Sequence, residues 1–429
     1  MKVTLLYLPH PYLKQPDAQA PIGLLYLVAS IEKNHPDTEV EVCNFSHSLT
    51  HEAIASLPES DVYGISVTSL ELLQANRFAH LIKERFPNSK VLLGGPGTFT
   101  DEFVDWVVID SICQGEGEIT ISEMLDDISN NKLKKVYKGV SVVDLDKIPF
   151  PNRSYLGEYQ GGNIFAYNKN YKGSQSTVIL SSRGCPFKCS FCGSPKFTNN
   201  TKGLRFRSPK NLVEEIKQVI NNQGIYQFRF SDDMFTANRK RVLKICELLK
   251  ELDIVWRISC RVKPFDREMA QALFDAGCKE VSFGIESFDN DVLNVLKKQT
   301  TAEDNYRALK VCEDVGITSR VLFMIRTPGQ TPKTIDRNIE WLEKVPFDIL
   351  ACTSFVPIPG SDIWDNPDNY NIEILDRNLD NYNFYFFGKN GENNLKDIIK
   401  IKDRSLEEFN MESQIFRDYL KNTGKLNEG

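Results

Sequence analysis

The chain has 429 residues, of which 41% are hydrophobic and 26% charged, as is typical of a folded protein with two or three domains. Its 52 lysines and arginines and 58 aspartates and glutamates give a net charge of −6. We therefore expect neither nucleic acid nor an anionic membrane surface as a partner. No apolar run approaches the roughly 20 residues of a membrane span, and Pro9 ends the first apolar stretch too early for a secretion signal. These features predict a cytoplasmic protein with a small-molecule substrate.

The first 145 residues alternate short β-rich runs with helical patterns. Helices are expected at 25–33 and 71–85, and strands at 2–8, 39–44, 62–66, 90–94 and 111–113. Strands that alternate with helices form parallel sheets through right-handed crossovers. The pattern therefore predicts an α/β, doubly wound, Rossmann-like domain over residues 1–145.

Three loops rich in small residues follow the last three of these strands. They contain the candidate ligand-binding residues Ser66, Thr68, Ser69, Gly94, Gly95, Gly115, Glu116 and Gly117. Ligands of open parallel sheets bind at the carboxyl ends of the strands. Any one of these loops alone could simply turn the chain, but the three together predict a ligand-binding edge.

A second alternation of strands and helices starts at residue 176, after a proline-containing linker at 146–175. Helices are expected at 209–221, 238–251, 267–276, 302–315 and 332–344, and strands at 177–181, 227–230, 255–259, 280–284, 319–325 and 349–354. Six β/α units predict a partial (β/α)6 TIM-like barrel over residues 176–365. The polar segment 366–429, with a helical pattern at 405–420, is a C-terminal extension expected to cap the barrel or contact substrate.

Three of the ten cysteines, Cys185, Cys189 and Cys192, lie within eight residues, and the other seven are scattered. In a reducing compartment such a cluster indicates metal or redox chemistry rather than disulfides. The spacing would also place three small side chains on one face of a helix. Gly184 and Pro186 disfavour a helix interior, so a metal-binding loop is the better interpretation.

Zinc and an iron–sulfur cluster are the two candidates for this loop. A structural zinc needs four cysteine or histidine ligands, and all five histidines lie within residues 10–80. A catalytic zinc held by three thiolates remains an alternative. Three soft thiolates suit a four-iron cluster that leaves one iron open to an external ligand.

The Cys-x3-Cys-x2-Cys spacing, with Phe191 before the last cysteine and a strand before the loop, resembles the radical S-adenosylmethionine (SAM) superfamily. The resemblance covers the whole predicted barrel. It implies a [4Fe-4S] cluster on Cys185, Cys189 and Cys192 whose open iron chelates the amino and carboxylate groups of SAM. One electron from an external donor such as flavodoxin or ferredoxin would then cleave SAM to methionine and a 5′-deoxyadenosyl radical. These cysteines are the predicted catalytic and metal-binding residues, and Phe191 is a predicted cofactor contact.

Two acidic motifs near the ends of the predicted barrel strands are candidate contacts for SAM. Glu286 and Ser287 follow the fourth strand, where a carboxylate can accept hydrogen bonds from ribose hydroxyls, and the family's motif there is similar. Asp232 and Asp233 follow the second strand. Either aspartate binds the methionine ammonium or positions substrate, or else it only caps the next helix.

Arginines near the third and fifth barrel strands are further candidates. Arg261 and Arg320 offer guanidinium groups for a carboxylate of the cofactor, and a structural ion pair is an equal alternative for each. The segment from Arg326 to Gln330 resembles the family's Gly-x-Pro-Gly-Glu-Thr turn. Here arginine replaces the glycine and glutamine the glutamate, which argues against close backbone contact with a ligand at this turn.

The first domain, by its order, size and loop placement, resembles the cobalamin-binding domain of cobalamin-dependent radical SAM enzymes. The resemblance implies cobalamin as a further cofactor. No histidine is followed by glycine three residues later, so the Asp-x-His-x-x-Gly motif that supplies a cobalt ligand elsewhere is absent. Cobalamin bound here would therefore lack that lower ligand.

Three functions remain open from the sequence. The favoured one is radical methylation of an unactivated carbon, or phosphorus, in a small metabolite or natural-product intermediate. The second is a radical elimination, rearrangement or cyclisation in which the first domain does not take part in methyl transfer. The third is an iron–sulfur or zinc binding protein without catalysis.

Overall fold

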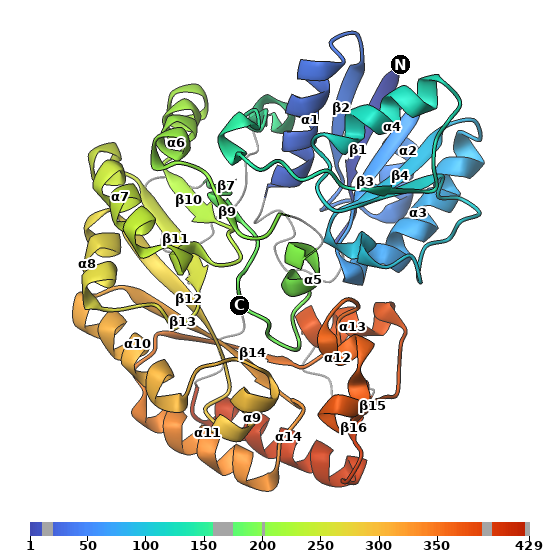
Figure 1. Ribbon diagram of the computed structural model, residues 1–429. Coiled ribbons are helices and arrows are strands. Elements are labelled where there is room, and N and C mark those ends of the chain that lie inside the picture. Colours follow the sequence, from blue (N-terminus) through green and yellow to red (C-terminus); the bar gives the residue numbers. More distant parts are fainter. Residues whose placement is uncertain (11–19, 158–174, 200–201, 388–396, 425–429) are drawn as a thin grey trace. The chain divides into compact units, whose positions relative to one another are not determined.

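The computed structural model describes residues 1–10, 20–157, 175–199, 202–387 and 397–424. The chain forms two compact units (Figure 1). Unit 1 comprises Met1–Gly162, Lys196–Arg205 and Asn378–Phe384, and unit 2 comprises Asn163–Pro195, Phe206–Arg377 and Tyr385–Gly429. The sequence did not predict that two short, distant segments belong to unit 1. Most of the predicted linker, 158–174, lies outside the described residues.

Unit 1 contains a six-stranded parallel sheet with the strand order β2-β1-β3-β4-β5-β6. The strands are β1 (Lys2–Tyr7), β2 (Glu39–Asn44), β3 (Val62–Ser66), β4 (Lys90–Gly94), β5 (Ser111–Gln114) and β6 (Val136–Lys138). The helices are α1 (Ile22–Asn34), α2 (Thr50–Ser56), α3 (Leu72–Arg85) and α4 (Thr120–Ser129). The strand order reverses between β1 and β3, as at the ligand-binding switch point of doubly wound folds. The predicted fold class is confirmed, while α2, α4 and β6 were not predicted.

Both faces of this sheet are covered by helices, α1 and α4 on one face and α2 and α3 on the other (Figure 1). One core cluster joins Leu5 and Val62 of the sheet to Val28 of α1 and Leu125 of α4. Strands buried on both faces read as nearly continuous Val, Ile and Leu runs. This burial explains why these strands were recognisable from the sequence.

Unit 2 contains a second six-stranded parallel sheet with the order β14-β13-β12-β11-β10-β7. The strands are β7 (Thr177–Ile179), β10 (Gln227–Phe230), β11 (Val255–Cys260), β12 (Cys278–Glu286), β13 (Thr318–Ile325) and β14 (Ile349–Ser354). The helices on its outer face are α6 (Pro209–Gln223), α7 (Arg239–Leu249), α8 (Arg267–Asp275), α10 (Ala302–Val315) and α11 (Pro332–Lys344). Within the described residues β7 and β14 form opposite edges, so the sheet curves without closing (Figure 1). This is the predicted partial barrel.

The barrel helices α6 and α10 each begin directly after an N-capping residue. The Ser208 hydroxyl accepts a 3.2 Å hydrogen bond from the amide of Asn211, with Pro209 in the first turn. Thr301 forms a capping box with Asp304 at the start of α10. Such caps satisfy backbone amides that have no partner within the helix. Because particular residue types form them, the starts of these helices can be recognised in the sequence.

The strands of the barrel have an apolar outer face, whereas their inner face carries both polar and apolar side chains. On β13, Val321 and Phe323 pack in the core beneath the helices. Arg320, Leu322 and Met324 alternate with them and remain partly exposed. Because side chains alternate across a strand, these three residues line the inside of the barrel and leave it accessible.

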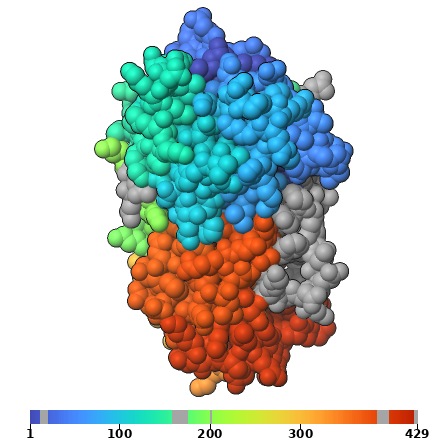
Figure 2. All heavy atoms as spheres, turned by 90° about the vertical axis from the view of Figure 1, so that its right-hand side faces the viewer, coloured from blue at the N-terminus to red at the C-terminus, as the bar shows by residue number. Residues whose placement is uncertain are grey.

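The C-terminal extension follows α12 (Asp362–Asp365) and contains β15 (Ile372–Ile374), paired antiparallel with β16 (Ile399–Ile401), and α14 (Leu406–Asn422). Phe416 of α14 stacks on Phe323 at 5.5 Å between ring centroids, within the core of unit 2. Figure 2 shows this part of the chain, orange to red, gathered on one face. The predicted helix at 405–420 is confirmed. Among the described helices, none is long and apolar enough to span a bilayer.

Candidate active site

The three clustered cysteines lie in the loop between β8 (Ser182–Arg183) and α5 (Ser194–Asn199). Cys189 is buried, and Cys185 and Cys192 are half-buried. Ser190 holds the loop in place: its amide donates to the carbonyl of Leu296 at 3.0 Å, and its carbonyl accepts from the amide of Ile363 at 3.0 Å. The loop therefore has a defined backbone without a helix through the cysteines.

N–H groups of the protein donate hydrogen bonds to the cysteine sulfurs. Arg261 Nη1 lies 3.0 Å from Cys189 Sγ, and the amide of Ser194 lies 3.4 Å from Cys192 Sγ. Burial raises the pKa of Cys185 to about 11, and it also raises the pKa of Cys192. N–H donors directed at sulfur stabilise the thiolate form that iron binds.

Within the described chain, no three thiol, imidazole or carboxylate groups already converge on a point that could hold a metal ion. The donor set nevertheless fits an iron–sulfur cluster, because it offers three thiols from one short loop. Loading requires the cysteine side chains to turn toward a common centre and to release their protons.

Asp232 fixes the chain where it enters the cysteine loop. One carboxylate oxygen accepts from the amide of Ser181 at 2.6 Å, and the other accepts from the hydroxyl of Ser182 at 2.8 Å and from that of Ser181. The side chain is buried, at 4% exposure. In this geometry Asp232 positions β7 and β8; its predicted contact with SAM stays a prediction.

Asp233 faces the other side of the same loop. Its carboxylate accepts from the hydroxyl of Ser194 at 3.2 Å, and burial raises its pKa. It therefore lies next to the segment that follows Cys192. Of the two adjacent aspartates, Asp233 has fewer bonds to the protein and is the better placed to meet a ligand.

Glu286 forms a buried ion pair at the end of β12. Its Oε1 lies 2.9 Å from Nζ of Lys298, a residue that the sequence did not single out. The same Nζ stands 5.7 Å from the ring centroid of Phe191, next to the last cysteine, within the range of a cation–π interaction. Any side chain at Gly284 would meet the carboxylate at 2.6 Å. The pair thus joins two predicted cofactor contacts, Glu286 and Phe191.

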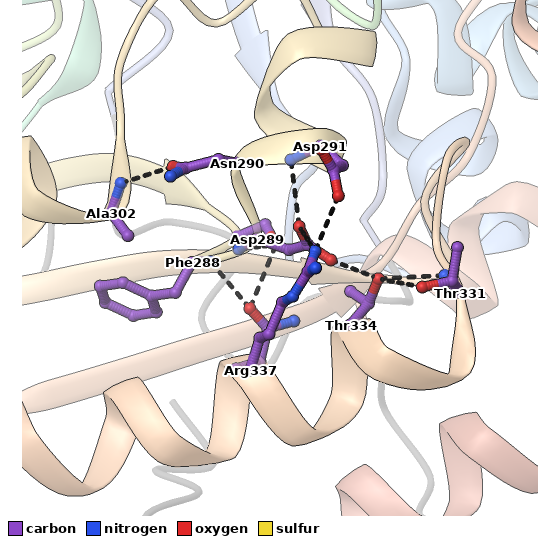
Figure 3. A network of polar contacts seen from close by, with 10 residues as sticks. Phe288, Asp289, Asn290, Asp291, Ala302, Thr331, Thr334 and Arg337 are labelled. Atoms are coloured by element: carbon purple, nitrogen blue, oxygen red, sulfur yellow. Dashed lines mark hydrogen bonds and ion pairs between the residues drawn. The ribbon is translucent and has the colours of Figure 1, made fainter.

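The loop after Glu286 is held by a network around Asp289 (Figure 3). Asp289 accepts from the hydroxyl of Thr334 at 2.6 Å and pairs with Arg337 at 2.7 Å. Ser287 donates to Asn338 at 3.1 Å. Its hydroxyl is therefore bonded to α11, and its predicted role toward SAM stays a prediction. Sequence reasoning missed Asp289, whose position as the cap of α9 (Asn290–Val295) was the available signal.

The candidate arginines differ in their surroundings. Arg261 packs over the ring of Phe187 at 3.9 Å and reaches Cys189, so it lies beside the cysteine loop. Arg320 pairs with Glu280 through Nε at 3.0 Å. The ion pair anticipated as an alternative for Arg320 is thus present, and contact of either arginine with SAM remains a prediction.

Arg326 and Gln330, the two residues of the turn after β13 that differ from the family's motif, both contact the C-terminal extension. Arg326 pairs with Asp397 at 2.7 Å and also donates to Asn410. Gln330 donates to Glu412 at 3.2 Å. The arginine and glutamine that replace the family's glycine and glutamate therefore attach the extension to the barrel.

In unit 1 the three predicted loops follow β3, β4 and β5 at one edge of the sheet. Two of them pack together closely, because a Cβ at Gly97 would lie 2.5 Å from the Thr68 carbonyl oxygen. A Cβ at Gly94 would meet nothing within 4 Å. Ser66 and Ser69 lie in the first of these loops, on either side of Thr68. The backbone at Gly94 is thus open to a ligand, while Gly97 serves packing.

The third loop has a buried acid. Glu116 pairs with Arg205, through Nη1 at 3.0 Å, and accepts from the amide of Val142 at 3.2 Å. Gly115 has a φ of +129°, and Gly117 lies against Leu27. Glu116 therefore anchors segment 196–205, which begins four residues after Cys192.

Comparison with known proteins agrees with this architecture. The family model of the radical SAM superfamily matches residues 179–342. An uncharacterized methyltransferase of Pyrococcus horikoshii is 30% identical over 371 residues, which are 80% of this chain and 78% of that protein. The chain belongs to the radical SAM superfamily. This membership implies a [4Fe-4S] cluster and SAM as cofactors, and the chain is an enzyme of the superfamily.

Further relatives show similarity that extends over both units. The bacteriochlorophyllide d C-8(2)-methyltransferase of Chlorobaculum tepidum is 27% identical, covering 73% of this chain and 70% of that protein. The anaerobic magnesium-protoporphyrin IX monomethyl ester cyclase of Rubrivivax gelatinosus is 26% identical, covering 81% and 69%. The solved structure of TsrM from Kitasatospora setae, with cobalamin and a [4Fe-4S] cluster bound, has a TM-score of 0.64 at 20% identity, covering 84% and 76%. The last match extends the shared fold over both units.

Proposed function

We propose that this protein is a cobalamin-dependent radical SAM methyltransferase that methylates an unactivated carbon, or phosphorus, of a small molecule. The observation that carries the proposal is the 30% identity to a methyltransferase over a region that includes both units. The shared fold with TsrM, solved with cobalamin and a [4Fe-4S] cluster, supports the same pairing of cofactors.

In unit 2, Cys185, Cys189 and Cys192 would hold the cluster. When bound, the cluster supplies the electron that cleaves SAM and a Lewis-acidic iron that binds it. Arg261 donates a hydrogen bond to the Cys189 sulfur, which favours its thiolate form. Asp232 keeps the entrance of the loop in place through Ser181 and Ser182. An electron donor of the flavodoxin or ferredoxin class would reduce the cluster.

In unit 1, the edge formed by the loops after β3, β4 and β5 would hold cobalamin. The backbone at Gly94 is open there. Ile119 and Val140, which flank the loop after β5 and the end of β6, are each 45% exposed. Exposed apolar side chains and an open glycine backbone after neighbouring strands of one sheet suit the apolar face of a large planar ligand.

A second candidate function is a radical cyclisation or rearrangement. It is favoured by the similarity to the anaerobic cyclase of Rubrivivax gelatinosus, which also covers 81% of this chain. In that reaction unit 1 would not deliver a methyl group.

Anaerobic reconstitution with iron, sulfide and hydroxocobalamin separates these functions. Tight corrinoid absorbance together with formation of S-adenosylhomocysteine, after reduction with a chemical reductant, is expected for the methyltransferase. Formation of 5′-deoxyadenosine without bound corrinoid would refute methylation and favour the second candidate. The Cys185→Ala variant serves as the cluster-free control and is expected to form neither product.

A further inference from the structure

Three arginines and one glutamate face the inside of the barrel on four consecutive strands. Strand register sets Arg229 of β10 beside Arg257 of β11, and Arg257 beside Glu280 of β12. Arg320 of β13 lies diagonally across from Glu280 on the neighbouring strand and forms an ion pair with it. We call these four residues the lumen cluster. Its charges sum to +2.

The single carboxylate of the lumen cluster is shared by two of its arginines. Glu280 Oε1 lies 3.1 Å from Arg257 Nη1 and 3.0 Å from Arg320 Nε. Arg257 Nη2 lies 3.3 Å from the hydroxyl of Ser282. Arg257 and Arg320 therefore pair with the same carboxylate, and this carboxylate is buried, since Glu280 is only 2% exposed.

Arg229 is the unmatched member of the lumen cluster. Within the described part of the chain, its guanidinium makes no hydrogen bond and no ion pair. Burial lowers its pKa, and so does repulsion from Arg320. Burial likewise lowers the pKa of Arg257 to about 9. The Arg229 side chain is partly exposed, and the one carboxylate near it, Glu280, already pairs with Arg257 and Arg320. The cluster therefore keeps positive charge that an anion entering the barrel can neutralise.

The lumen cluster lies deeper in the barrel than the predicted cofactor contacts. Glu280 precedes Glu286 by six residues on β12, and Arg229 precedes Asp232 by three. At about 3.3 Å per residue, the Cα atoms of the cluster lie between roughly 3 Å (Arg229) and 20 Å (Glu280) from the carboxyl ends of their strands. The partly exposed Leu322 and Met324 line the inside of β13 between the two levels. An anion here would belong to a molecule that extends away from the cysteine loop.

We propose that the lumen cluster binds an oxyanion of the substrate, a carboxylate or a phosphate, through Arg229 and Arg320. Planar guanidinium groups recognise both anions by paired hydrogen bonds. The inference rests on the proposed function in one respect only, namely that the substrate enters the barrel of unit 2. It adds a substrate class: molecules that carry a carboxylate or a phosphate group.

Thermal unfolding of the full-length, cluster-loaded protein tests the proposal without a known substrate. The probes are inorganic phosphate and sodium propionate, each at 10 mM and compared with chloride at equal ionic strength. At least one is expected to raise Tm by about 2 °C or more, as millimolar binding to the folded state would. A larger shift with phosphate identifies a phosphoryl group, and a larger shift with propionate identifies a carboxylate.

The variants Arg229→Gln and Arg320→Gln are expected to lose this anion-dependent shift. Arg229→Gln should also have a higher Tm than the native protein in chloride, because it removes a cation that is repelled by Arg320. Arg229→Lys keeps the charge and should retain a reduced shift. The matched control is Arg267→Gln, an exposed arginine of α8 in the same unit that pairs with Asp314 at 3.6 Å, and it should behave as the native protein.

Three results would overturn the proposal. They are the absence of any anion-specific shift in the native protein, a shift that persists in both Gln variants, and competition of the anions with SAM in equilibrium binding. The last result would assign the lumen cluster to the cofactor's own carboxylate. None of these measurements depends on corrinoid or on methylation, so failure here is distinct from failure of the proposed function.

Discussion

Replacing Asp232 by asparagine weakens three hydrogen bonds at the entrance to the cysteine loop. The buried carboxylate accepts from the amide of Ser181 and from the hydroxyls of Ser181 and Ser182. Hydrogen bonds to a charged group contribute about 1.5 to 3 kcal/mol each, and neutral ones about 1 kcal/mol. An amide keeps one acceptor oxygen and offers a donor to serine hydroxyls that can rotate. We therefore expect Asp232→Asn to lower the free energy of unfolding by about 2 to 3 kcal/mol.

Urea unfolding followed by tryptophan fluorescence measures this loss. Trp256 is fully buried in the core of unit 2 and reports its unfolding. Because Asp232 anchors the strand end that leads into the loop, the variant should also retain less iron after anaerobic reconstitution. Asp232→Ala leaves buried donors without a partner and should cost about 4 kcal/mol.

Asp233→Asn is the matched control. Its carboxylate accepts a single side-chain hydrogen bond, from Ser194 at 3.2 Å. Burial already raises its pKa, so a neutral amide is tolerated at this position. We expect a loss below about 1 kcal/mol. Equal losses for the two asparagine variants, or a loss below about 0.5 kcal/mol for Asp232→Asn, would refute the assigned roles.

Three further predictions concern the cysteine loop, the C-terminal extension and the glycine loops. Cys185→Ala should retain no [4Fe-4S] cluster after reconstitution, whereas Cys352→Ala should match the native protein; equal iron content in both would contradict the assignment. Arg326→Ala breaks a largely buried ion pair and should lower the free energy of unfolding by about 2 kcal/mol, with faster tryptic release of the C-terminal segment; an unchanged cleavage rate would argue against this anchor. Gly97→Val should destabilise unit 1 by about 1 to 3 kcal/mol, since a Cβ would lie 2.5 Å from a backbone carbonyl oxygen, and calorimetry should show no such loss for Gly94→Ala.

The sequence by itself determined most strands of the two sheets and the main helices of unit 2, and it placed the ends of seven elements correctly. The strands β2, β3, β4, β10 and β14 and the helices α10 and α11 match their predicted bounds. These predictions succeeded because burial imposes a local period on side chains and because caps and turns use particular residues. The Cys-x3-Cys-x2-Cys motif was also recognisable from the sequence, because all three thiols lie within one loop.

Only the tertiary structure decided which polar side chains form hydrogen bonds and ion pairs with one another. Nothing local distinguishes Asp232 from Asp233, yet only Asp232 turns back to the serines 50 and 51 positions earlier. Glu280 meets Arg320 because β12 and β13 are neighbours in register. Glu116 likewise meets Arg205, 89 residues later. Strand order and register decide which residues so distant along the chain become partners, and no local sequence pattern contains that information. For the same reason, the net positive charge of the lumen cluster can be recognised only from the structure.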